Sequence, residues 1–312
     1  MIRDSKLYKR IGGIQCVDKV LDRYHFCINW IKYHTIRYNK TGKVALCCIA
    51  KCENDYIREY VEHYLSIGVD TVFIYDNNDV DGETFDSVIG DYISSGLCVV
   101  NDVRGKKVCQ WSSYAHCYNT YGKEYDWMMF FDCDEFLTIT LPGKNVKSFL
   151  EMDIFKKYQM IHVNWMCYGD NDMLDNDGRK VTDRFINPIL PYDFVYEYPD
   201  IPENNHVKTI VRCGLKNVMF SSHLCWNDYV KSCDVYGCET NIHSPFKPYI
   251  HDVAYLRHYQ TKTIGEWVRI KQKRGYPDQT DGTAQKRLGL DFFFKINSDT
   301  IQKRDYVASL MI

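Results

Sequence analysis

The sequence lacks the segments that would place it across a membrane or outside the cell. It has no long uninterrupted apolar run and no signal-peptide pattern. Its 14 cysteines follow no paired spacing, so neither a disulfide framework nor a zinc site is expected, and buried free thiols suit a reducing compartment. We therefore expect a cytoplasmic protein.

Strong net charge is also missing, because 39 Lys and Arg residues nearly balance 41 Asp and Glu residues and leave a net charge of −2. No field that attracts nucleic acid follows from this composition, and no nucleic-acid partner is expected. Two phosphate-binding motifs are absent as well. No G-x-G-x-x-G pattern follows the first apolar strand and no P-loop pattern occurs, so a bound diphosphate would need a metal ion to neutralise it.

What the sequence does contain is a regular alternation of strand and helix patterns between residues 44 and 131. Apolar runs of strand length occupy 44–50, 71–75, 97–100 and 128–131, and amphipathic helical patterns occupy 55–67, 85–93 and 108–121. Asn54 or Asp55 is expected to cap the first helix, and Gly68 to end it. Such alternation predicts right-handed βαβ units and an α/β fold with a mainly parallel sheet.

The apolar run from Trp127 to Phe131 ends in the carboxylates of Asp132 and Asp134. On an extended backbone, side chains two residues apart point the same way, so the two carboxylates are expected to converge. Open α/β sheets bind ligands at the carboxyl edge of their strands, and hard oxygen ligands suit Mg²⁺ or Mn²⁺. The alternative is that these acids only cap a strand in solvent.

Polar residues also follow the other strands of this pattern. Lys51 and Glu53 follow the first strand, and Asp76 and Asn77 follow the second. Because parallel strands present their carboxyl ends at one edge of a sheet, these groups are expected to line one crevice with the aspartates. The alternative is that loops are polar in general, which explains one or two such clusters better than it explains several.

Several segments occur in a specific order along the chain. They are Ala50–Tyr64, Gly68–Asn77, Gln110, Trp127–Phe136, Asn164–Asp170, Arg184–Phe185, and His258–Thr263 with Lys271 and Gly275. This ordered series resembles glycosyltransferase family 92 and related bacterial family 2-like glycosyltransferases. The sequence departs from that pattern at Cys52, where Asn is usual, and at Tyr60, where Trp is usual.

The resemblance implies a GT-A fold, a nucleotide-sugar donor, a divalent cation (Mn²⁺ or Mg²⁺) and inversion at the anomeric carbon. UDP-galactose is the favoured donor, because galactose transfer recurs in such families. Residues 1–43 are then an N-terminal extension, and residues 277–312 a tail packed on the domain. The domain itself, residues 44–276, divides into a nucleotide-sugar and metal half, 44–140, and an irregular α+β acceptor half, 141–276.

Within this scheme we assign roles on the donor side of the site. Asp134 would bind the metal directly, Asp132 would contact metal or ribose, and a neutral His258 would be a third ligand. The diphosphate would meet the basic residues Lys262, Lys271 and Arg274, whose alternative is a solvated helix face. Contacts to uracil, ribose and other parts of the donor are expected from Lys51, Glu53, Asp76, Asn77 and Gln110.

The acceptor side needs a base on the face of the sugar opposite the leaving group. Asp170 is our choice, with Asp172 as the close rival and Glu239 as a more distant one. Gly169 would allow a sharp turn that presents the Asp170 carboxylate. Acceptor contacts are expected from Trp165, Arg184 and Lys208, and a structural ion pair is the alternative for the last two.

The sequence thus predicts a metal-dependent inverting hexosyltransferase that moves galactose or another hexose from a UDP-sugar to an oligosaccharide, free or lipid-linked. A role in bacterial surface polysaccharide synthesis, such as capsule, is the setting that we expect. Residues 292–294 or the basic 262–274 segment would give peripheral contact with the inner face of a membrane, unless the phenylalanines pack in the core. Two alternatives stay open: a metal-dependent phosphoesterase or nucleotidyltransferase, and a non-catalytic sugar-binding scaffold of the same fold.

Overall fold

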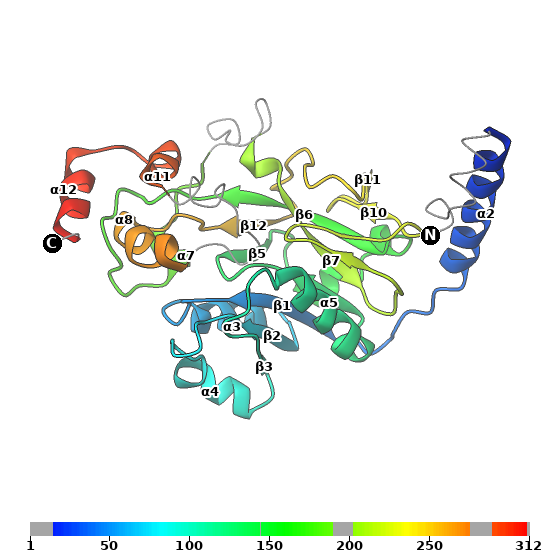
Figure 1. Cartoon of the computed structure of the whole chain (residues 1–312), viewed down its shortest axis with the longest axis horizontal. Helices are drawn as coiled ribbons and strands as arrows, with labels where there is room; N and C mark the ends of the chain where they lie inside the picture. The colour runs from blue at the N-terminus through cyan, green and yellow to red at the C-terminus, as the bar shows by residue number, and fades with distance from the viewer. Residues whose placement is uncertain (1–14, 144, 190–201, 275–288, 311–312) are drawn as a thin grey trace.

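The computed structural model describes residues 15–143, 145–189, 202–274 and 289–310, arranged around a large sheet (Figure 1). Gly275 and the expected boundary at 276–277 lie outside these residues. The strands of the first half are β1 (Val44–Ala50), β2 (Thr71–Asp76), β3 (Cys98–Asp102) and β4 (Trp127–Phe130). The helices between them are α3 (Ile57–Ser66), α4 (Asp86–Ser94) and α5 (Gln110–Tyr121). These strands pair in parallel in the order β4-β1-β2-β3, which confirms the predicted βαβ half.

Strand β1 lies at the centre of this half because it is apolar on both faces. All seven of its residues are buried, as is typical of a parallel strand covered by helices on both sides. Leu46 and Cys48 belong to one core cluster together with Tyr60 of α3. Cys47 belongs to a second cluster together with Tyr114 of α5. Alternate side chains of one strand therefore anchor helices on opposite faces of the sheet.

The second half is less regular, as predicted. Its longer strands are β5 (Glu135–Ile139), β6 (Met160–Cys167), β7 (Val207–Arg212) and β12 (Ala254–His258). Its two-residue strands are β8 (Met219–Phe220), β9 (Cys225–Trp226), β10 (Ser232–Cys233) and β11 (Glu239–Thr240). Its helices are α6 (Val146–Leu150), α7 (Val181–Arg184), α8 (Ile264–Glu266), α9 (Gln272–Arg274), α11 (Leu290–Ile296) and α12 (Ile301–Leu310).

Strands β7 and β12 join the two halves. Strand β7 lies antiparallel between β4 and β6, so the full order is β11-β10-β6-β7-β4-β1-β2-β3. Strand β12 pairs in parallel with β6 and antiparallel with β5, and His258 stands opposite Glu135 in that register. Because Glu135 directly follows Asp134, this pairing brings His258 beside the aspartates. This mixed sheet with helices on both faces confirms the predicted fold class.

The predicted cap of the first helix is wrong. Helix α3 begins after Tyr56 without a side-chain cap, and the side chain of Asn54 instead donates to the Thr84 carbonyl at 3.2 Å. Residues 15–34, within the predicted N-terminal extension, form the 20-residue helix α2. By contrast, Gly68 follows α3 in the left-handed region, with φ +101°, as expected.

The phenylalanines suggested for membrane contact lie in the protein core. Phe292 and Phe293 of α11 are buried, and the Phe292 ring stacks on Trp267 with centroids 5.7 Å apart. Membrane contact through this cluster is therefore wrong. Within the described ranges, no helix combines the length and apolarity that a membrane crossing requires. The thirteen cysteines from Cys27 to Cys238 are free thiols.

His162 on β6 gives the fold a testable pH dependence. Its Nδ1 lies 3.0 Å from the Thr240 hydroxyl, and burial lowers its pKa to about 3 from an ordinary value of 6.5. Between these two values the unfolded chain binds a proton here that the native state does not bind. His162 therefore lowers stability progressively as the pH falls below about 6.5.

Replacing His162 by Gln should remove this contribution. Relative to the original chain, the variant's free energy of unfolding should rise by about 2 kcal/mol between about pH 7 and about pH 5. Urea denaturation at both pH values measures the difference. His243→Gln, at an exposed position, is the control and should keep the original pH dependence. A difference between His162→Gln and the original chain that does not change with pH would contradict this account.

Candidate functional site

Asp132 and Asp134 lie on a turn that follows β4. The turn is closed by a hydrogen bond from the Glu135 N–H to the Asp132 carbonyl at 3.0 Å, with Cys133 and Asp134 between them. The extended backbone expected at this point is therefore wrong, and the two side chains are not held parallel by strand geometry. Each carboxylate instead has its own set of partners.

Asp132 is held by three donors. Lys208 of β7 places its Nζ 2.5 Å from Oδ2, while Gln110 Nε2 and the Tyr114 hydroxyl donate to Oδ1 at 3.2 and 3.1 Å. Burial opposes the charge of Lys208, but the carboxylates of Asp132 and Glu135 outweigh burial and raise its pKa. Lys208 was expected to contact the acceptor, with a structural ion pair as the alternative. The structure shows the ion pair, with Asp132.

Asp134 is almost completely buried among basic groups. Its Oδ2 lies 2.8 Å from Lys271 Nζ and 3.9 Å from an Arg274 nitrogen, and its Oδ1 lies 3.7 Å from His258 Nε2. Burial alone would raise the pKa of Asp134, but Lys271 and the other neighbouring cations outweigh it and hold the pKa below its usual range. The carboxylate is therefore ionised.

The three expected diphosphate cations converge on one pocket. Lys262, Lys271 and Arg274 line it together with Tyr56. Arg274 forms an ion pair with Glu53, and Lys262 Nζ lies 4.0 Å from Glu53 Oε2 and 4.0 Å from the centroid of the Tyr56 ring. The structure therefore gathers Glu53, Asp134 and the cations that the resemblance assigned to the donor.

The other residues expected to contact the donor lie at the ends of β1 and β2. Their polar side chains have partners within the protein. Lys51 pairs with Asp79 at 2.7 Å. The Asp76 carboxylate accepts the backbone N–H two residues on, and burial raises its pKa. Asn77 donates its side-chain amide to carbonyls of the loop that leads to α5. These residues shape the edge of the sheet beside Glu53.

Trp165 on β6 is enclosed by other rings. Its indole Nε1 donates to Glu135 Oε1 at 2.8 Å. The ring stacks on His206, with centroids 4.8 Å apart, and contacts His258, with centroids 4.1 Å apart. Because these rings cover Trp165, the expected stacking on a sugar is not open in this arrangement. Its visible role is to orient Glu135 and His258.

The candidate bases follow β6 on a loop that the C-terminal helix α12 holds. Lys303 Nζ lies 2.7 Å from Asp170 and 3.0 Å from Asp172. The left-handed backbone of this loop occurs at Asn171 and Asp172, with φ +50° and +58°, and not at Gly169, where a sharp turn was expected. Burial raises the pKa of Asp170, whereas hydrogen bonds from Ser298 and Lys303 lower that of Asp172. Asp170 is therefore the stronger base of the two.

Sequence reasoning missed Lys303 and placed Glu239 wrongly. Lys303 lies 131 positions from Asp172, and no local pattern links the two. Glu239 belongs to the edge strand β11 and pairs with Lys231 at 2.9 Å on the surface. Four strand spacings, roughly 19 Å, separate β11 from β4. Glu239 is therefore too far away to serve as the base.

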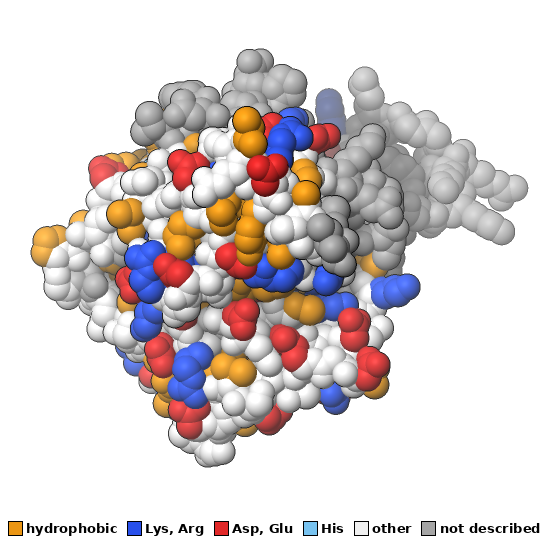
Figure 2. Space-filling view, turned by 90° about the vertical axis from the view of Figure 1, so that its left-hand side faces the viewer, with side chains coloured by type: hydrophobic (Ala, Val, Ile, Leu, Met, Phe, Trp, Pro, Cys, Tyr) orange, Lys and Arg blue, Asp and Glu red, His pale blue; other side chains and the backbone are white. Residues whose placement is uncertain are grey.

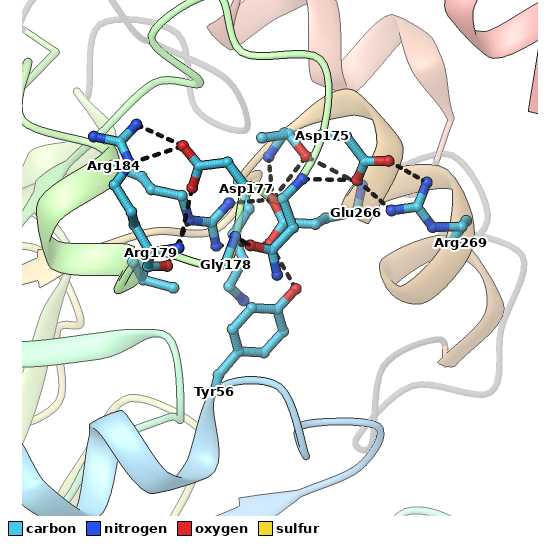
Figure 3. Close-up of polar contacts among 12 residues, drawn as sticks. Tyr56, Asp175, Asp177, Gly178, Arg179, Arg184, Glu266 and Arg269 are labelled. Atoms are coloured by element: carbon cyan, nitrogen blue, oxygen red, sulfur yellow. Dashed lines mark hydrogen bonds and ion pairs between the residues drawn. The ribbon is translucent and has the colours of Figure 1, made fainter.

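Arg184 forms a buried ion pair with Glu266 (Figure 3). Its two terminal nitrogens donate to the two carboxylate oxygens at 2.8 and 2.9 Å. The Tyr56 hydroxyl donates to the same carboxylate at 2.7 Å. Arg184 was expected to contact the acceptor or to form a structural ion pair. The structure shows the structural ion pair.

This ion pair anchors the helical segment that carries the cations of the site. Helix α8, the π-helix Trp267–Lys271 and helix α9 follow one another without a break. Glu266 fixes the start of the segment, and Arg269 pairs with Asp175 farther along (Figure 3). Lys271 and Arg274 on its last turns then reach the buried carboxylates.

Asp134 and His258 are a donor pair that suits a divalent cation. Burial lowers the pKa of His258 to about 3, so the imidazole is neutral, and its Nδ1 has no hydrogen-bond partner among the described residues. A neutral imidazole beside an ionised carboxylate is a common ligand set for Mn²⁺, and other positions remain for phosphate and water. In the ranges that the structure covers, no three His, Cys, Asp or Glu side chains gather as a metal site, so Asp132 is not a third ligand in this arrangement.

Comparison with known proteins matches residues 44–288 to the family described as glycosyltransferase family 92. Two proteins carrying that family name are 31% identical to this chain. The one from Ricinus communis aligns over 113 residues, which is 36% of this chain and 20% of the relative. The one from Oryza sativa subsp. japonica aligns over 129 residues, or 40% and 21%. The aligned part of the chain thus spans about a fifth of the length of these relatives.

Solved structures of S. aureus TarS are also similar to this chain. One is 13% identical, covers 58% of this chain and 31% of that chain, and has a TM-score of 0.35. TarS 1–349 in complex with UDP is 12% identical, covers 58% of this chain and 51% of that chain, and has a TM-score of 0.33. These identities and TM-scores are too low to add to what the family match shows.

Replacing Arg184 by Met tests whether the buried ion pair holds the helical segment in place. The substitution leaves the Glu266 carboxylate buried without its partner, and we expect a loss of about 3–5 kcal/mol in unfolding free energy. Arg179→Met is the control, since this Arg pairs with Asp177 and its side chain is 58% exposed. That change should cost less than about 1 kcal/mol by urea denaturation. Equally small losses in both variants would count against an anchoring role.

Proposed function

Because the chain belongs to glycosyltransferase family 92, we propose that it transfers a hexose from a UDP-sugar to a glycan acceptor. The proposed reaction is one in-line displacement with inversion, assisted by Mn²⁺ or Mg²⁺. The observation that carries it is the buried Asp134 carboxylate between neutral His258 and the cations Lys271 and Arg274. UDP-galactose as donor, and bacterial surface polysaccharide as the product, are predictions from the family resemblance.

The ion pairs of the site supply groups for both the cation and the diphosphate. Asp134 and Glu53 now neutralise Lys271 and Arg274. A nucleotide diphosphate would compete for these two basic residues, because bonds from ionised donors to phosphate are short and strong. Asp134 would then be available to hold the divalent cation together with His258. When bound, the cation would stabilise negative charge on the leaving diphosphate.

The chain's own residues would perform three further tasks. Lys271 and Arg274 would hold the leaving diphosphate from a helical segment that the Arg184–Glu266 pair fixes. Asp170 is the proposed base, because burial raises its pKa and so its affinity for the acceptor proton. The acceptor hydroxyl would have to replace Lys303 as the partner of that carboxylate.

A donor-hydrolysis and transfer assay tests the proposal. UDP-galactose, UDP-glucose and their N-acetyl analogues would be offered with Mn²⁺ or with EDTA, and UDP release measured. We expect release from one donor, loss of release in EDTA, and a fall of at least about 100-fold in Asp134→Asn, which removes an ionised ligand. Asp153→Asn, at a surface position whose side chain is 86% exposed, is the matched control.

Two outcomes of that assay would overturn parts of the proposal. UDP release that persists in EDTA would exclude the proposed metal requirement. If no donor releases UDP and calorimetry shows no UDP binding by the folded protein, a UDP-sugar donor is excluded. Binding of UDP without release, if Asp134→Asn weakens that binding, would support the donor site and assign the missing component to the acceptor.

Lys271 and Lys273 lie on one helical segment and provide a matched pair of variants. Lys271 contacts the buried Asp134 carboxylate, whereas Lys273 is exposed. We expect Lys271→Met to weaken binding of UDP with Mn²⁺ at least tenfold, because a charged hydrogen bond contributes about 1.5–3 kcal/mol. Lys273→Met should change the Kd by less than about twofold. Calorimetric titration measures the Kd of UDP for each variant. An unchanged Kd for Lys271→Met would exclude a contact between Lys271 and the diphosphate.

A further inference from the structure

Helix α2 (Gln15–His34) lies at one end of the molecule, opposite the end that carries α12 (Figure 1). It touches the rest of the protein through one side. Asn29 Nδ2 donates to the Asp228 carbonyl at 3.3 Å, and the Tyr33 hydroxyl donates to the Lys157 carbonyl at 3.4 Å. Asn29 and Tyr33 are four residues apart and therefore share one face of the helix. Phe26 and Trp30 precede Asn29 and Tyr33 by three residues and therefore flank this face, whereas Tyr24 and Ile31 point away from it.

Four large apolar side chains of α2 are exposed. Tyr24 is 52% exposed, Phe26 70%, Trp30 55% and Ile31 54%. Phe26 and Trp30 are four residues apart and lie side by side, and Ile31 follows Trp30 round the helix. An exposed cluster of large apolar side chains on a surface helix commonly marks a binding face. These side chains are not part of the buried core of the protein.

The same part of the chain is strongly basic. Residues 1–43 contain ten Lys and Arg residues against three Asp residues, a net charge of +7, while residues 44–312 carry −9. On α2 itself, Lys19 and Arg23 are exposed, while Lys32 Nζ lies over the Tyr229 ring, 5.4 Å from its centroid. Asp18 and Asp22 leave the helix a net charge of +1. The opposite end of the molecule has no such bias, since acidic and basic side chains are interspersed over the face in Figure 2. The overall charge of −2 therefore conceals a strongly basic N-terminal part of the sequence, residues 1–43.

We propose that α2 binds the surface of an anionic lipid bilayer. Phe26, Trp30 and Ile31 would enter the boundary between headgroups and acyl chains, where aromatic rings are favoured. Lys19 and Arg23 would lie among lipid phosphates, each strengthening binding by about fivefold. Nucleic acid would also attract the charge, but it would not bury the aliphatic Ile31. This inference does not depend on the proposed function.

Sedimentation with lipid vesicles tests the proposal on the full chain. We expect binding to vesicles that contain phosphatidylglycerol, little binding to pure phosphatidylcholine, and weaker binding at high salt, because salt screens the attraction. Phe26→Ser combined with Trp30→Ser should weaken binding at least about tenfold, and so should Arg23→Glu, which reverses one charge. Since these side chains are exposed, thermal unfolding should be unchanged in both variants.

Matched controls lie elsewhere on the surface. Ile301→Ser removes an apolar side chain of α12 that is 81% exposed, and Lys123→Glu reverses an exposed charge far along the chain. Both should bind vesicles as the original chain does. The proposal fails if anionic vesicles are not bound, or if the α2 variants bind as well as the controls. It also fails if ultracentrifugation shows a dimer that the Phe26 and Trp30 changes dissociate, or if the face binds RNA but not lipid.

Discussion

Burial of the Asp134 carboxylate is the constraint on which the rest of the site depends. A buried carboxylate without positive partners is strongly destabilising, so residues 258–274 must cover this edge of the sheet and bring their basic groups to it. Lys271 can reach Asp134 only because the Arg184–Glu266 pair fixes the segment from which it projects. Packing of α11 against the same segment completes the support. Helix α11 therefore helps to hold the cations of the site in place.

Backbone strain gathers around this site. Lys262 and Cys52 both have left-handed backbones, with φ +51° and +54°, and the π-helix Trp267–Lys271 carries one of the cations. Such features persist where the surrounding structure holds them and occur often at functional sites. Cys52 stands where the family pattern usually has Asn, a residue that adopts this conformation more readily. Its N–H is held by the Asn78 side chain at 2.8 Å, which steadies the turn without that Asn.

The two binding surfaces inferred for this protein use charge in different ways. At the sheet edge, Asp134 and Glu53 already neutralise the basic residues, so a ligand is recognised by exchange of partners at short range. On α2, the basic groups are exposed, and their attraction acts over about a Debye length and weakens with salt. A buried site can therefore select a donor, while an exposed helix recruits the protein to a surface. The two surfaces also lie in parts of the chain with opposite net charge, +7 for residues 1–43 and −9 for residues 44–312.

The sequence by itself determined the βαβ half of the fold and the position of the aspartates after β4. These depend on local periodicity and on apolar runs of strand length, which short segments carry without reference to the rest of the chain. The tertiary structure alone decided the partners: Lys208 for Asp132, Glu266 for Arg184, and Lys303 for Asp170. Each pair joins residues far apart in the chain, and the pairing of β12 with β5 that brings in His258 is equally distant. Contacts of this kind depend on how strands pair and helices pack, which no local pattern specifies.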